Sequence, residues 1–98
     1  MKKLKILGYD YVVKFSPSSD DGGMHDAGRC NATKQIIIVD KETHKQCQES
    51  TVLHEILEAL QYHLELGLEH RIIASLESGL YQVLTDNGVD LSQLTKGL

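Results

Sequence analysis

The chain predicts a single α+β domain, residues 1–98, in which a small N-terminal antiparallel or mixed β-sheet packs on two main α-helices. The first 40 positions hold alternating and β-branched apolar residues, as strands do, whereas apolar residues after position 50 recur with the period of a helix. The length of 98 residues, with 41% hydrophobic and 24% charged residues, is ordinary for one globular domain. The predicted order is therefore strands first and helices second.

The N-terminal half is predicted to form the sheet. Apolar residues alternate on either side of Gly8, which predicts a strand with a bulge or a tight hairpin within residues 2–15. Residues 16–23 hold the only proline and two glycines, and they predict a surface loop. The β-branched run at 35–39 predicts a buried strand, with a turn at 31–34 and a short partner strand at 28–30.

The C-terminal half is predicted to form the helices. The first should begin between residues 41 and 50, with Asp40 as a plausible N-cap, and end at Gly67. The second should span about 69–84 and stop at 86–88, followed by a short turn capped by Asp90 or Ser92. The predicted buried stripes are Leu53, Ile56, Leu57, Leu60 and Leu64 on the first helix, and Ile73, Leu76, Leu80, Val83 and Leu84 on the second.

Charge, hydropathy and cysteine content argue against several classes of protein. The net charge is −4 and the ten basic residues are scattered apart from those at positions 2, 3 and 5, so no nucleic-acid partner is expected. No apolar run approaches the roughly 18 residues of a membrane span, so no membrane partner is expected. Cys30 and Cys47 lack metal or redox spacing and should be free thiols, and the N-terminus alternates like a strand rather than a signal peptide; both predict a cytoplasmic location.

The candidate chemistry lies in the first predicted helix. His54, Glu58, Gln61 and Glu65 recur at helical spacing and form a polar margin beside the apolar stripe. Side chains four residues apart on a helix project together, so His54 and Glu58 can hold one divalent metal ion such as Zn²⁺. Glu55, directly after the His, can act as general base or acid on the attacking water. The familiar zinc-peptidase helix has a second His where this chain has Glu58.

A catalytic zinc site needs a third protein ligand. Glu77 is the preferred one, because it lies on the next predicted helix and two antiparallel helices would bring their polar edges together. His70 shares that edge and is the alternative, as a ligand or as a group that orients one. The remaining histidines and two tyrosines are expected to lie outside the site: His25, His44, His63, Tyr62 and Tyr81.

The segment TVLHEILEALQYHLELGLEHRIIASLESGLYQVLTDNG, preceded by the strand QIIIVD, resembles the small zincin-like domains. It is similar to minimal gluzincin-type metallopeptidases and to short phage and bacterial proteins whose helix reads HEI-x-E. The resemblance extends over residues 30–88. It implies a zinc-dependent hydrolase fold, with His54 as a ligand, Glu55 as the catalytic carboxylate and Glu77 as the third ligand.

Two functions are therefore expected. The first is a metallopeptidase-like hydrolase acting on a peptide or protein substrate, in a minimal cleft that a larger partner or a homodimer would complete. The second is a catalytically inactive zincin-like domain used for protein interaction or structure. Metal distinguishes them, because only the hydrolase requires a divalent ion at His54, and a purely structural metal would have a closed shell of four protein ligands.

Overall fold

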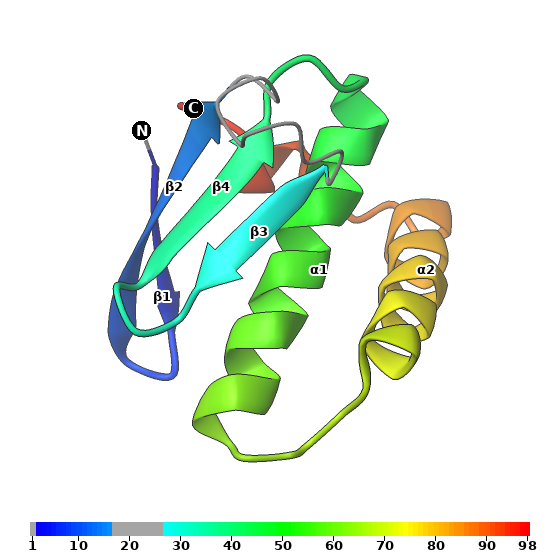
Figure 1. Ribbon diagram of the computed structural model, residues 1–98. Helices are drawn as coiled ribbons and strands as arrows, with labels where there is room; N and C mark the ends of the chain where they lie inside the picture. The colour runs from blue at the N-terminus through cyan, green and yellow to red at the C-terminus, as the bar shows by residue number, and fades with distance from the viewer. Residues whose placement is uncertain (1, 17–26) are drawn as a thin grey trace.

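The computed structural model describes residues 2–16 and 27–98 (Figure 1). Its elements follow the predicted order, with strands first and helices second, and confirm the α+β class. Residues 17–23 of the predicted loop lie outside the described residues, and so does His25. The elements are β1 (Lys2–Ile6), β2 (Tyr9–Ser16), β3 (Gly28–Asn31), β4 (Ile36–Asp40), α1 (Lys45–His63), α2 (His70–Asp86) and the 3₁₀ helix η2 (Leu91–Leu94).

The four strands form one mixed sheet in the order β1-β2-β4-β3. A two-residue turn joins β1 and β2, and both of its residues, Leu7 (φ 52°) and Gly8 (φ 85°), have positive φ. The structure thus has the tight hairpin, one of the two arrangements that the sequence predicts, and not the bulged strand. β4 runs parallel to β2, and β3 pairs antiparallel to β4 at the other side of the sheet. The short strand β3 is thus an edge strand.

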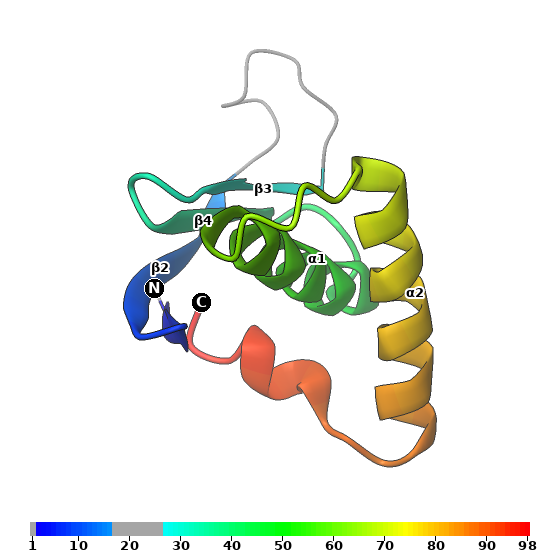
Figure 2. The ribbon, with the colours of Figure 1, turned by 90° about the horizontal axis from the view of Figure 1, so that it is seen from below.

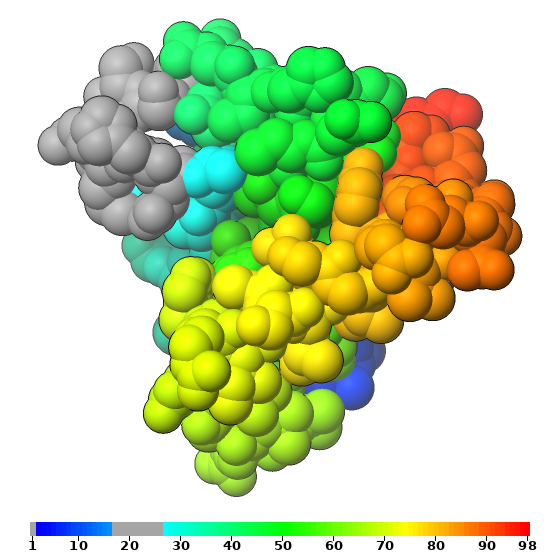
Figure 3. Space-filling view, turned by 90° about the vertical axis from the view of Figure 1, so that its right-hand side faces the viewer, coloured from blue at the N-terminus to red at the C-terminus, as the bar shows by residue number. Residues whose placement is uncertain are grey.

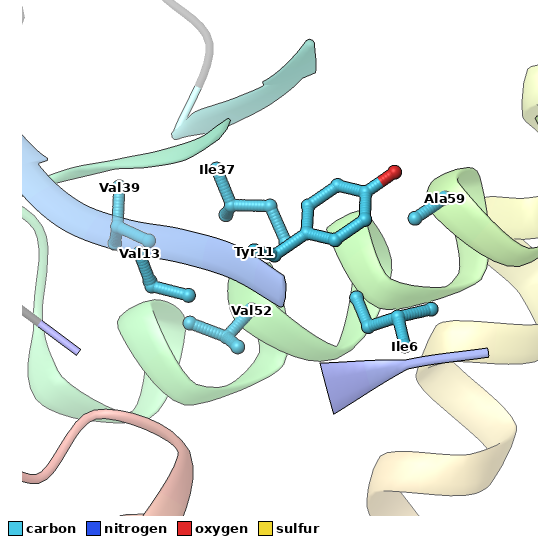
Figure 4. Close-up of a cluster of buried hydrophobic side chains, with 7 residues drawn as sticks. All are labelled: Ile6, Tyr11, Val13, Ile37, Val39, Val52 and Ala59. Carbon is cyan, nitrogen blue, oxygen red and sulfur yellow. The ribbon is translucent and has the colours of Figure 1, made fainter. Parts of the chain in front are cut away.

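The core lies between the sheet and α1 (Figure 4). Tyr11 and Val13 of β2 alternate toward α1, as do Ile37 and Val39 of β4, and all four are fully buried. On α1 the fully buried residues are Val52 and Ala59, two turns apart. The cluster is Ile6, Tyr11, Val13, Ile37, Val39, Val52 and Ala59.

The predicted apolar stripe of α1 is only partly correct. Ile56 and Leu60 pack against the core, but the sheet-facing line runs through Val52 and Ala59. Leu64 is the C-cap residue and is 52% exposed. The reason is that α1 packs against both the sheet and α2, so several sides of the helix are apolar and no one stripe identifies the core face (Figure 2).

The residues predicted to cap and to end α1, Asp40 and Gly67, differ from those in the structure. The helix begins at Lys45, within the predicted range, but its N-cap is His44, whose Nδ1 accepts a hydrogen bond from the Gln46 N–H. The Asp40 carboxylate instead accepts from the Glu42 N–H and closes the turn after β4. The helix ends at His63, before Gly67, because Glu65 adopts a positive φ of 54° and permits a left-handed C-terminal cap.

α2 packs chiefly against α1 and forms an outer layer, with α1 between it and the sheet (Figure 2). It ends at Asp86 with Gly88 (φ 84°) just beyond, as predicted, and Asp90 caps the following 3₁₀ turn. Its predicted buried stripe is largely wrong, because Ile73 is its only buried residue. The exposed members of the stripe are Leu76 (45%), Leu80 (38%) and Val83 (50%).

Candidate metal centre

A cleft of about 1020 Å³ opens between the edge strand β3, α1 and α2. Helical spacing places the margin of α1 along one wall, and the short connection from α1 to α2 turns the polar edge of α2 toward it. Both helices therefore contribute to the same cleft. All five residues that the sequence selects line it: His54, Glu55, Glu58, His70 and Glu77.

Three of these residues bring potential ligand atoms together. Glu58 Oε2 lies 3.5 Å from His54 Nε2 and 3.4 Å from His70 Nδ1. His54, Glu58 and His70 each offer one ligand atom within 4.8 Å of the others. Zinc bonds of about 2.0–2.1 Å in a tetrahedral arrangement separate neighbouring ligand atoms by roughly 3.3 Å. The two separations that involve Glu58 fit that spacing, and the candidate atoms of His54 and His70 lie within 4.8 Å of each other.

Glu77 contacts the other ring nitrogen of His54. Its Oε1 lies 3.2 Å from His54 Nδ1, while Nε2 of the same ring is the atom near Glu58. The imidazole is only 12% exposed and is held between carboxylates from two helices. A carboxylate on the distal nitrogen of a metal-binding His fixes its tautomer and ring orientation. This geometry suits Glu77 to orienting His54, with His70 in the position of a third ligand.

Glu55 lies on α1 one turn after Thr51, where the helix passes close to Gly28 of β3. Its side chain lines the cleft although the residue is only 6% exposed. A Cβ on Gly28 would lie 2.4 Å from Thr51 Cγ2, 2.8 Å from the Ile38 carbonyl oxygen and 3.7 Å from Glu55 Oε2. Only glycine fits that position, so Gly28 permits the contact that places the carboxylate of Glu55 beside the edge strand.

Cys30 also lines the cleft, although it is not among the site residues predicted from the sequence. Burial, together with the charges of Glu55 and Glu58, raises the pKa of its thiol to about 12. A thiol with this pKa stays protonated at neutral pH and is a poor nucleophile. One feature of the sequence could have indicated that Cys30 lies near the site. Cys30 lies on the short strand that was predicted to pair with the β-branched run, and that run precedes the helix of the candidate ligands.

The other candidates have structural contacts. His63 forms a 2.6 Å hydrogen bond through Nε2 with the Tyr11 hydroxyl and stacks on Tyr9 at 4.3 Å, so it lies outside the site as predicted. Tyr81 donates to Glu49 Oε1 at 3.4 Å, between α2 and α1. Tyr62 lines the cleft and also lies edge-on to His63, so it combines packing with a place at the cleft wall.

Comparison with protein-family models, with curated protein sequences and with solved structures found no match to this chain. Among residues 2–16 and 27–98, no helix combines the length and the apolar character needed to cross a membrane.

Proposed function

We propose that this protein is a zinc-dependent hydrolase of the metallopeptidase type, with His54, Glu58 and His70 as metal ligands. The observation that supports this most directly is the position of Glu58 Oε2, which lies at ligand spacing from both His54 Nε2 and His70 Nδ1. His70 takes the role of third ligand in this proposal because Glu77 is engaged with the opposite nitrogen of His54. One carboxylate and two imidazoles are a ligand set typical of catalytic zinc.

The neighbouring residues have separate roles in the proposal. Zinc, when bound, supplies Lewis acidity and lowers the pKa of a water toward neutrality. Glu55 accepts a proton from the attacking water and returns it to the leaving amine, because its side chain lines the cleft that also holds the candidate ligands. Glu77 accepts the Nδ1 proton of His54 and keeps Nε2 directed at the metal position.

The edge strand indicates the class of substrate. β3 lies at the border of the sheet, and its residues 28–31 line the cleft beside the candidate ligands. An extended peptide adds to such an edge by backbone hydrogen bonds, which would hold a scissile bond near Glu55. We therefore propose a peptide or protein substrate bound in extended form.

Metal content tests the proposal first. The untagged protein, purified and then equilibrated with zinc, should retain about one zinc per chain by elemental mass spectrometry, consistent with a three-ligand site. His54→Ala and Glu58→Gln should lose it. Glu69→Gln is the matched control, because it removes the same charge next to His70 from a side chain that is 74% exposed. Absence of zinc from the unaltered protein after equilibration would overturn the proposal.

Catalysis is tested separately with Glu55→Gln, which keeps the shape of a nearly buried side chain. This variant should retain zinc and lose cleavage of a fluorogenic peptide library by a factor of about 100 or more, as expected for removal of a general base. Zinc retention without cleavage by the unaltered protein would favour the interaction or structural domain instead. The two measurements therefore separate metal binding from hydrolysis.

A further inference from the structure

The outer face of α2, defined here as Ile72, Leu76, Gly79, Leu80 and Val83, has no cover in the described chain. Its four large side chains are 37–50% exposed, and a Cβ on Gly79 would meet nothing within 4 Å. Most of this face points away from α1, because Ile73, Glu77 and Tyr81, which contact the rest of the domain, lie on another side of the helix. Only Leu80 adjoins Ile73 at the edge of the face. Figure 3 shows α2 as a yellow to orange ridge across one side of the molecule.

This face also lacks charge. Between Arg71 and Asp86 the helix has one charged residue, Glu77, and its carboxylate contacts His54. The exposed side of a helix in a soluble domain normally has charged residues, and a glycine in the middle costs about 1 kcal/mol relative to alanine. An uncharged apolar face with a central exposed glycine is typical of a surface on which another helix packs closely.

The sequence of the face is complementary to itself in the antiparallel direction. Ile72, Leu76, Gly79 and Val83 are spaced by four, three and four residues, the spacing of a helix–helix seam. When two copies of this helix are set antiparallel about their common centre, Ile72 lies opposite Val83. Leu76 then lies opposite Gly79, which leaves room for it. A two-fold contact of this kind is isologous, as in most homodimers.

The charges at the ends of α2 support the same arrangement. Arg71 lies in the first turn and Asp86 is the last helical residue, so each has the sign that the dipole of its own helix disfavours. Arg71 has Glu69 at 3.9 Å, but both side chains are largely exposed. Arg71 and Asp86 are on the same flank of the outer face, and this flank meets itself in an antiparallel pair. Each charge then lies beside the opposite charge and the favourable helix end of the second copy.

We propose that the protein forms a two-fold symmetric homodimer in which the outer face of α2 packs antiparallel against the same face of a second copy. The proposed dimer contact does not use the candidate metal ligands, which lie on another side of α2, so the proposal does not require bound metal. Leu66 and Val89, in the segments before and after α2, are also exposed apolar residues, at 53% and 45%.

Sedimentation equilibrium of the full chain over a concentration series tests this proposal. The unaltered protein should form dimers, and Leu76→Glu should raise the dissociation constant by more than about 100-fold, because it buries a charge in the seam. Ser78→Glu is the matched control, because it adds the same charge to an exposed position outside the outer face and should have little effect. Circular dichroism should show both variants folded, since both positions are exposed in the single chain.

Charge reversal tests the antiparallel geometry. Arg71→Glu and Asp86→Arg should each weaken the dimer roughly fivefold to tenfold, and the double reversal in one chain should restore it. Both changes improve the match to the dipole of the helix, so a weaker dimer cannot result from loss of α2. Three results would overturn the proposal. They are a protein that stays monomeric at all concentrations, a dimer unaffected by Leu76→Glu, and a double reversal whose loss of dimer affinity is the sum of the losses in the two single reversals. Binding of the monomer to lipid vesicles through this face would overturn it too.

Discussion

Tyr11 joins the hydrophobic core to the end of α1. Its ring is fully buried between strand and helix, and its hydroxyl shares a 2.6 Å hydrogen bond with His63 Nε2. Burial is the main cause that raises the pKa of Tyr11 to about 12, and the nearby Cys30, Tyr62 and Tyr9 raise it further. A neutral phenol is therefore part of the folded state.

The first prediction concerns alkaline stability. Because the pKa of Tyr11 rises from 10.0 to about 12 on folding, the folded state binds this proton more tightly, and the associated stability is lost as pH increases from about 10 to 12. Tyr11→Phe should lower the free energy of unfolding at pH 7 by about 1 kcal/mol through loss of the hydrogen bond. Tyr11→Phe should also reduce the fall in the free energy of unfolding between about pH 10 and 12, which urea unfolding at a series of pH values measures.

This measurement belongs in a Cys30→Ala background, because the pKa of the Cys30 thiol is also raised to about 12 and would contribute to the same decline. An alkaline decline of equal steepness with Tyr11 and with Phe would contradict the prediction.

The second prediction separates the roles of Glu77 and His70, and it rests on the proposed zinc site. Glu77→Gln should weaken zinc binding by about 10–100-fold, as loss of an orienting carboxylate does. His70→Ala should weaken it more, because it removes a ligand. Zinc titration against a competing chelator gives both values, and the reverse order would make Glu77 the third ligand.

At the scale of elements, the end of α1 has an unusual residue at its cap. Glu65 adopts φ 54°, where glycine is favoured. The Leu66 N–H donates to the Gln61 carbonyl and the Glu65 N–H to the Tyr62 carbonyl, which is the hydrogen-bond pattern of a Schellman cap. The fold thus places a strained residue at the turn that directs the chain toward α2.

The third prediction follows from this cap. Glu65→Gly should raise the free energy of unfolding by roughly 0.5–1 kcal/mol, because relief of the left-handed strain exceeds the added entropy of the unfolded chain. Thermal and urea unfolding measure the change. Glu69→Gly is the control, because Glu69 has a φ of −68° and no strain to relieve; equal gains in both variants would contradict the explanation.

Sequence reasoning succeeded for elements whose signal is local. The turn at Gly8 requires positive φ, and the β-branched run at 36–39 forms a strand in almost any context. The predicted N-cap of α1, Asp40, was wrong. The N-cap in the structure is His44, and histidine is an uncommon residue at this position. The predicted buried stripe of α2 is largely wrong because periodicity shows that one face of a helix is apolar but does not show whether another element covers that face.

The candidate site was predictable in its membership and not in its geometry. The spacing of His54 and Glu58 places them on one helical edge, and a short connection makes the next helix return along it, so His70 and Glu77 had to lie nearby. Which nitrogen of His54 each carboxylate approaches depends on rotamers and on the offset between two helices. Those are tertiary quantities that sequence spacing does not define.

The fourth prediction belongs to the whole molecule and rests on the proposed zinc site. Ligands from α1 and α2 make zinc a link between two elements, so binding should stabilise the fold by about 2.7 kcal/mol when free zinc is 100 times the dissociation constant. For a chain of this length that corresponds to a rise of roughly 10–20 °C in the melting temperature. Calorimetry should detect this rise in the unaltered protein and not in His54→Ala.

α2 buries one side chain, that of Ile73, and its other contacts with α1 include the polar contacts of Glu77 and Tyr81, which has a consequence for how the molecule responds to its surroundings. The helix separates two surfaces, one facing His54 and one facing solvent. Whatever orders α2 from one side prepares it for the other, so the proposed zinc site and the proposed dimer should strengthen each other by the same factor. Dilution would then release metal, and chelation would release subunits.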